Sequence, residues 1–142
     1  MGKYQKFDDL PVWQEAARLY SRVLDLLEEP NLPFSASLKN QLDRAALSVS
    51  NGIAGSFDRM PTAEMIRFLA QARAAAAEVQ SMSAVLSQRP KLSRLTESLG
   101  QIRALAESCG RQLSAWLATV DNGPSRPRPV ENASETARPR AA

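Results

Sequence analysis

The chain has 142 residues, with 18 lysines and arginines against 15 aspartates and glutamates, one cysteine and no histidine. One cysteine excludes a disulfide within a chain, and the absence of histidine excludes Ser-His and Cys-His catalytic pairs and argues against zinc, haem and non-haem iron sites. No apolar run approaches the roughly 18 residues that a membrane span requires. We therefore expect a cytoplasmic protein of one domain, with no membrane segment, no cofactor and no enzymatic activity.

Prolines divide residues 1–122 into four segments, and each segment has apolar residues at spacings of three and four, the period of an amphipathic helix. The first segment predicts a helix over about residues 9–29, where Asp8 and Asp9 suit the N-terminus by capping and by charge. The apolar stripe that we assign to its core face is Leu10, Trp13, Ala17, Tyr20, Leu24 and Leu27.

The second segment contains the sequence SVSNGIAGSFDR (residues 48–59), whose glycines and serines resemble a phosphate-binding loop. The apolar rhythm passes through it without a change of phase, so the sequence predicts a helix over about residues 36–59 and no ligand. Its stripe is Leu38, Leu42, Ala45, Val49, Gly52 and Ser56. A glycine costs roughly 1 kcal/mol of helix propensity relative to alanine, which close approach of another helix can offset. The helix-packing residues expected there are Gly52, Gly55, Ala72 and Ala76, beside the alanine run 74–77.

The last two segments predict helices over about residues 62–88 and 91–121. The stripe of the third helix is Met65, Leu69, Ala72, Ala76, Val79, Ser83 and Leu86. The stripe of the fourth is Leu92, Leu95, Leu99, Ile102, Ala106, Cys109, Leu113, Trp116 and Val120. Cys109 is therefore expected to be a small buried hydrophobic side chain. Four helices with short proline-containing connections predict an all-α, antiparallel up-down-up-down four-helix bundle over residues 1–122.

Residues 123–142 contain almost no large apolar side chains, so we expect a disordered C-terminal tail that is rich in proline and arginine. The tail holds four arginines and two glutamates, whereas residues 1–122 hold 14 basic and 13 acidic side chains. The positive net charge therefore comes largely from the tail. The bundle by itself has only a weak electrostatic footprint for nucleic acid.

Seven basic residues on the third and fourth helices are candidate nucleic-acid contacts: Arg67, Arg73, Arg89, Lys91, Arg94, Arg103 and Arg111. Each of them alone is better explained as part of a solvated face. They could, however, converge on one outer face of the bundle. In a ring of several copies, the positive electrostatic potentials of these faces would then add up and could bind RNA or DNA.

Four other side chains have two interpretations each. Arg44 is either a ligand or phosphate contact or, as we favour, a structural ion pair at a helix interface. Its candidate partners are Asp43, Glu78 and Glu107. Aromatic side chains can stack on bases, but helical spacing on apolar stripes favours core or oligomer-interface positions. The aromatic residues concerned are Trp13, Tyr20 and Trp116.

Several sequence blocks together resemble a known family. In chain order they are FDDLPVWQEA, LKNQLDRAALSV, GIAGSFDR and FLAQARAAAAE. They look like the successive signatures of the bacterial four-helix-bundle proteins encoded in intervening sequences of 23S ribosomal RNA genes. The final block, CGRQLSAWLATV, is also similar to the accessory variability determinant of diversity-generating retroelements. The resemblance covers residues 7 to about 120.

The resemblance implies a bundle that assembles into a ring-like homopentamer and has no known catalytic residues. It departs from the family in the second helix, whose signature usually reads Asn-Ile-Ala-Glu-Gly-x-x-x-Arg. Gly52 stands at the Asn position, Gly55 at the Glu position and Ser56 at the Gly position, so no function is transferred through this motif. We expect a self-assembling accessory or scaffold protein that associates with nucleic acid. The alternative is an accessory subunit of a retroelement reverse transcriptase that binds protein and RNA through basic helix faces.

Overall fold

The computed structural model describes residues 4–59 and 62–121, and all the regular secondary structure in them is helical. The α-helices are α1 (Pro11–Leu27), α2 (Ala36–Phe57), α3 (Ala63–Ser87) and α4 (Thr96–Asp121). The 3₁₀ helices are η1 (Phe7–Asp9) and η2 (Pro90–Leu95). The predicted all-α class is confirmed. The predicted tail of residues 123–142 lies outside the described residues.

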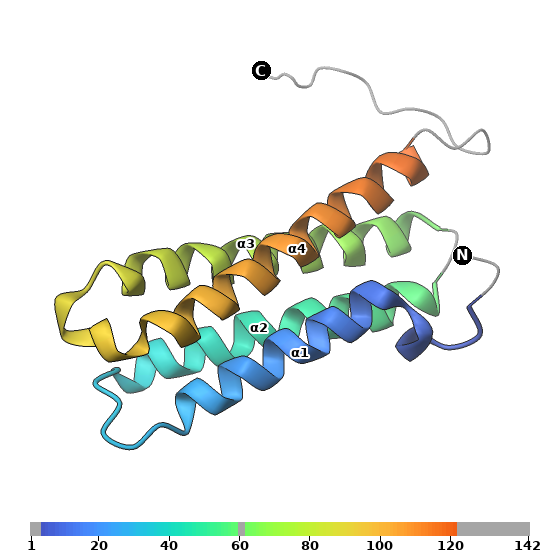
Figure 1. Ribbon diagram of the computed structural model, residues 1–142. Helices are drawn as coiled ribbons and strands as arrows, with labels where there is room; N and C mark the ends of the chain where they lie inside the picture. The colour runs from blue at the N-terminus through green and yellow to red at the C-terminus, as the bar shows by residue number, and fades with distance from the viewer. Residues whose placement is uncertain (1–3, 60–61, 122–142) are drawn as a thin grey trace.

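The four α-helices lie side by side, and each one packs against two others (Figure 1). α1 contacts α2 and α4, and α3 contacts α2 and α4. Figure 1 shows the α1–α2 and α3–α4 connections at one end of the bundle, and the end of α2 beside the start of α3 at the other. Helices that follow each other in the chain therefore run in opposite directions, and the surface has four seams: α1–α2, α2–α3, α3–α4 and α1–α4.

Three of the four predicted stripes form the hydrophobic core. In α2 the buried stripe residues are Leu42, Ala45, Val49, Gly52 and Ser56. In α3 every residue of the predicted stripe is buried, from Met65 to Leu86. In η2 and α4 the stripe is buried from Leu92 to Leu113, whereas Trp116 and Val120 are only partly buried. Helical periodicity thus located the inward faces of these helices.

The predicted core stripe of the first segment is correct at Leu10, which is buried, and wrong by one residue from Trp13 onwards. The buried residues of α1 are Val12, Ala16, Leu19, Val23 and Leu26. The predicted stripe lies beside them, with Trp13 and Tyr20 half-buried and Leu24 36% exposed. The two stripes have the same spacing, so periodicity alone does not choose between them. The smaller aliphatic side chains face the other three helices, whereas the aromatic side chains lie at the rim, where the Tyr20 hydroxyl reaches a polar partner.

The predicted starts of the first and fourth helices also need correction. Asp9 does not cap α1; its carboxylate accepts hydrogen bonds from the backbone N–H groups of Gln5 and Lys6, within the turn that leads into η1. Leu10 is extended (ψ 126°) and α1 begins at Pro11, because a proline disfavours helical geometry in the residue before it. Pro90 has the same effect on Arg89, which is extended (ψ 119°). Leu92 then departs from helical geometry (φ −106°, ψ 16°), so residues 90–95 form η2 and α4 begins only at Thr96.

The sequence SVSNGIAGSFDR is helical, as its periodicity predicts, and α2 is unbroken as far as Phe57. The serine hydroxyls that gave it the composition of a loop donate hydrogen bonds to carbonyl oxygens of the same helix. The Ser48 hydroxyl donates to the carbonyl of Arg44 at 2.8 Å, and the buried Ser56 hydroxyl donates to that of Ile53 at 2.7 Å. These serines therefore satisfy their polar groups within the helix.

Candidate nucleic-acid interface

The seven predicted basic residues are exposed, but they do not form one continuous patch. Three of them lie at the end of the bundle where α3 is connected to α4: Arg89, Lys91 and Arg94. Arg67 lies near the start of α3, at the opposite end of the bundle (Figure 1). The other three lie farther along α3 and α4: Arg73, Arg103 and Arg111. The seven residues are therefore distributed over both ends and the middle of α3 and α4.

Two of the seven residues form ion pairs on the surface. Arg67 pairs with Glu64 at 3.4 Å, and Arg94 pairs with Glu29 at the same distance and also donates to the carbonyl of Pro30. Exposed ion pairs contribute at most about 1 kcal/mol and are screened by salt. They nevertheless place a negative charge beside each arginine, which reduces the local attraction for a phosphate.

Arg73 of α3 and Arg111 of α4 line one groove at the α3–α4 seam. The groove is also lined by small side chains, Ala77 and Ser114 among them, and by one carboxylate, that of Glu107. Gln80 crosses the seam and donates a hydrogen bond to Glu107 at 3.3 Å. Among the described residues, no carboxylate lies within 4.0 Å of either arginine. This is the place where the structure brings predicted basic residues from two helices together.

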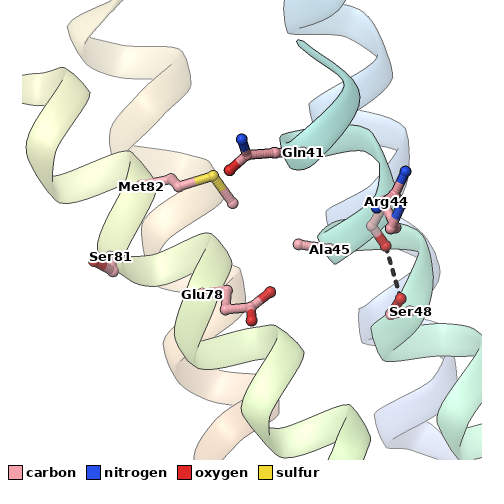
Figure 2. A pocket seen from close by; sticks show the side chains of 7 residues that line it. All are labelled: Gln41, Arg44, Ala45, Ser48, Glu78, Ser81 and Met82. Carbon is pink, nitrogen blue, oxygen red and sulfur yellow. Dashed lines mark hydrogen bonds between the residues drawn. The ribbon is translucent and has the colours of Figure 1, made fainter. Parts of the chain in front are cut away.

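A second groove follows the α2–α3 seam (Figure 2). It is lined by Gln41, Arg44, Ala45, Ser48, Glu78, Ser81 and Met82. Figure 2 shows the side chains of Gln41, Glu78 and Met82 directed into the space between the helices, whereas the Arg44 guanidinium points away from it. A neighbouring groove shares Ser48 and Glu78 and continues along the same seam to Phe68. The surface here is mixed, with apolar side chains such as Met82 and Phe68 beside one positive and one negative side chain.

The predicted ion pair of Arg44 is wrong for the part of the chain that the structure describes. Arg44 is exposed and has no carboxylate within 4.0 Å there. Two of its candidate partners have other donors: Asp43 accepts a 2.6 Å hydrogen bond from the Tyr20 hydroxyl, and Glu107 accepts one from Gln80. The phase of α2 turns Arg44 outward, since the neighbouring Ala45 occupies the buried position.

The aromatic residues lie at the rim of the core. Trp13 packs edge to face against Phe7, with ring centroids 5.3 Å apart, and Tyr20 is held by its hydrogen bond to Asp43. That hydrogen bond and the negative charge of Asp43 raise the pKa of Tyr20, together with partial burial. Trp116 is half-buried and packs on the core. The three side chains therefore lie at the edge of the core and not inside it, and their position in an oligomer interface stays a prediction.

None of the described helices is both long enough and apolar enough to cross a membrane. The same residues contain no group of three or more carboxylates or thiols that could hold a metal ion.

A family model for the 23S rRNA-intervening sequence protein matches residues 8–115, which include α1, α2 and α3 and most of α4. The chain belongs to this family. The corresponding part of the predicted resemblance is confirmed, while the similarity to the retroelement accessory determinant stays a prediction. No curated protein and no solved structure matches the chain significantly.

The two glycines at which this chain departs from the family's second-helix signature lie against α3. A Cβ atom on Gly52 would lie 2.9 Å from the Ala72 Cβ and 3.0 Å from the Phe68 carbonyl oxygen. A Cβ atom on Gly55 would lie 3.0 Å from the Phe68 ring. The α3 residues that lie nearest to the two glycines are thus Ala72 and Phe68, which precede the alanine run 74–77. Close packing of two helices accounts for both glycines without a ligand.

Arg59, which stands one residue before the arginine position of the signature, joins the end of α2 to α3. Its guanidinium lies 4.6 Å from the centroid of the Phe68 ring, a cation–π distance. The same group donates to the Gly55 carbonyl at 2.9 Å and pairs with Glu64 at 3.4 Å. In this member of the family the arginine therefore has intramolecular partners. Sequence analysis did not identify this cluster, because Phe68 lies on the flank of its helix rather than on a core stripe.

The α1–α4 seam contains a polar network that had no signal in the sequence. The Ser108 hydroxyl donates to Glu15 Oε1 at 2.7 Å, and the Gln112 amide donates to the same oxygen. The neighbouring Cys109 is fully buried, as predicted. Burial, with a smaller effect of the negative charge of Glu15, raises the pKa of Cys109 to about 12, although Arg18 acts in the opposite direction. The thiol therefore remains protonated at neutral pH and is a poor nucleophile.

Proposed function

We propose that the protein is a non-enzymatic, self-assembling helical bundle that associates with nucleic acid as an accessory or scaffold protein. The observation that carries the proposal is the pair Arg73 and Arg111, which come from different helices and line one groove. Both have guanidinium groups with no described carboxylate within 4.0 Å. A guanidinium has the planar donor geometry that matches a phosphate group, so the groove suits a nucleic-acid backbone.

Self-assembly is supported by apolar side chains at the α1–α2 seam. Leu24 of α1 and Leu47 of α2 are 36% and 37% exposed. Each lies one helical turn from the hydrogen bond between Tyr20 and Asp43, which joins the two helices. Covering such side chains with a second copy is favourable by about 25 cal/mol per Å² of apolar surface. The family resemblance implies a ring of five copies. Such a ring would contain five Arg73 and Arg111 grooves, whose positive electrostatic potentials would add up.

The salt dependence of binding tests the nucleic-acid part of the proposal. A labelled short oligouridylate is titrated with protein at several salt concentrations between about 50 and 200 mM, and the slope of log K against log salt is measured. Each neutralised phosphate of a single strand contributes about 0.7 to that slope. We therefore expect the slope of the R73Q/R111Q variant to be shallower than that of the wild type by about 1 to 1.5.

A matched control removes the same charge elsewhere. The K39Q/R44Q variant loses two positive charges from α2, which lines neither side of the α3–α4 groove. Arg44 is not assigned a phosphate contact, because its guanidinium points away from the α2–α3 groove and Glu78 places a negative charge there. Its slope should change less than that of R73Q/R111Q. Wild-type protein that fails to bind the oligonucleotide at the lowest salt contradicts the proposed function, because electrostatic binding is strongest there.

A further inference from the structure

A third groove lies at the α1–α4 seam and contains two arginines that the sequence did not single out. It is lined by Arg18, Ser21, Arg22, Gln101, Ala104 and Leu105 and has a volume of about 520 Å³. Arg18 and Arg22 are both exposed and lie four residues apart, so they project from one face of α1. α4 contributes an amide side chain and two apolar ones on the other side.

The two arginines of this groove form no ion pair with the described residues, although Asp25 lies one turn after Arg22 on α1. No described carboxylate lies within 4.0 Å of Arg18 or Arg22. The neighbouring acid on the same flank of α1, Glu15, already accepts hydrogen bonds from Ser108 and Gln112. Like charges four residues apart on a helix repel each other. A bound anion would remove this repulsion, and the groove has space for one between the helices.

The side chains in the groove favour a phosphate over a simple carboxylate. Two guanidinium groups can contact several oxygen atoms of one phosphate, or two successive phosphates, with paired hydrogen bonds. The Ser21 hydroxyl and the Gln101 amide add donors at the same seam. Ala104 and Leu105 give the groove an apolar part, which can lie against a sugar or a base.

This groove adjoins the α3–α4 groove across α4. Ala104 lines one of them and Arg111 lines the other, and the two residues lie two turns apart on the same face of the helix. Between them on that face lie the exposed Glu107, which accepts a hydrogen bond from Gln80, and the half-buried Ser108. A strand that crosses α4 from one groove to the other therefore passes beside the Glu107 carboxylate, on the side of Ser108.

We infer that the α1–α4 groove is a second phosphate-binding site, in which Arg18 and Arg22 contact the backbone of the same nucleic-acid strand that Arg73 and Arg111 bind. The inference rests on the proposed function and extends the binding surface from α3 and α4 to α1. The strand follows a path across α4 from one seam to the next. The structure thus assigns a binding role to both arginines of α1, although residues 1–30 hold six acidic and only four basic side chains.

Three double variants, each lacking two positive charges, test the inference by the same salt titration of labelled oligouridylate. They are R18Q/R22Q, R73Q/R111Q and K39Q/R44Q. We expect R18Q/R22Q to have a slope shallower than the wild type by about 1 to 1.5, as for R73Q/R111Q. The K39Q/R44Q control should keep a slope close to that of the wild type. Circular dichroism at each salt concentration checks that all three variants remain helical.

The outcomes separate failure of this site from failure of the proposed function. If the wild type does not bind the oligonucleotide at any salt concentration, both are overturned. If the wild type binds and R73Q/R111Q has a shallower slope, while R18Q/R22Q has the slope of K39Q/R44Q, the second site alone is overturned. Polyglutamate and unlabelled oligouridylate are also compared as competitors of the labelled oligonucleotide. If polyglutamate displaces it as effectively as unlabelled oligouridylate does, the phosphate assignment is overturned and the groove is a site for an acidic peptide.

Discussion

Gly52 of α2 lies so close to Ala72 of α3 that a Cβ atom on the glycine would be 2.9 Å from the alanine Cβ. The Phe68 carbonyl oxygen, a backbone atom that cannot move alone, would be 3.0 Å away. The two helices therefore approach each other almost backbone to backbone at this level of the bundle. The close approach offsets the roughly 1 kcal/mol that a glycine costs in a helix relative to alanine.

The substitution Gly52→Ala should destabilise the protein in spite of the better helix propensity of alanine. Forcing an extra methyl group into a packed contact costs typically 1 to 3 kcal/mol, which exceeds the propensity gain of roughly 1 kcal/mol. Urea denaturation followed by circular dichroism measures the difference. Gly100→Ala is the matched control: a Cβ atom there meets nothing within 4 Å, so this variant should be more stable than the wild type by up to about 1 kcal/mol. Equal effects of the two substitutions would contradict the close contact.

The contact of Arg59 with Phe68 should have a measurable coupling energy. A double-mutant cycle with Arg59→Met and Phe68→Leu isolates the pair from the other partners of the arginine, and we expect a coupling of about 0.5 to 1 kcal/mol. A second cycle, between Arg59 and Glu64, provides the comparison, because both side chains are at least 40% exposed and form an ordinary surface ion pair. High salt should remove the second coupling and retain most of the first. A zero coupling between Arg59 and Phe68 would show that the ring only fills space.

The fold was predictable from the sequence because the apolar residues of α2, α3 and α4 gather on one side of each helix. Met65 and Leu69 are buried because no competing stripe of the same spacing lies beside them. α1 has two such stripes, and the choice between Val12 and Trp13 depends on the width of the space that the other three helices leave. That width is a property of the assembled bundle rather than of one segment, so periodicity cannot supply it.

The surface sites were less predictable, because they depend on which side chains meet across a seam. Arg44 has no ion pair in the described chain, since Tyr20 donates to Asp43 and the guanidinium points away from Glu78. Arg18 and Arg22 have an ordinary helical spacing and no motif; only their position opposite α4 distinguishes them. The identity and spacing of residues therefore indicate where charges lie along one helix. They do not indicate which side chains of the adjacent helix lie beside those charges.

Cys109 should make stability depend on pH in the alkaline range. The pKa of the thiol is 9.0 when it is unperturbed and about 12 in the folded protein, so between these values the unfolded chain releases a proton that the folded chain keeps. The contribution of the thiol is therefore fully present below pH 9 and is lost as the pH rises towards 12, with a slope of at most about 1.4 kcal/mol per pH unit. Cys109→Ala lacks this effect, and all other titrating groups are shared. Above pH 9 the unfolding free energy of the wild type should therefore fall more steeply with pH than that of the variant. If the two plots of unfolding free energy against pH remain parallel, the buried thiol is contradicted.

The exposed leucines at the α1–α2 seam should control self-assembly. Leu24→Glu and Leu47→Glu together place two negative charges on the surface that we propose is covered by a second copy, so the double variant should have a lower mass in solution than the wild type by light scattering at equal concentration. Both side chains are more than one third exposed, and the fold of each copy should therefore be retained.

Val85→Glu is the control for this experiment, because Val85 is the most exposed of the large apolar side chains described, at 59%, and belongs to α3 instead of the α1–α2 seam. If general surface hydrophobicity drove association, this substitution would lower the mass at least as effectively as the change at either leucine. If the α1–α2 seam is the interface, the Val85 variant keeps the wild-type mass. The stripe from Trp13 to Leu27, which sequence periodicity assigned to the core of one bundle, would then lie in the contact between two.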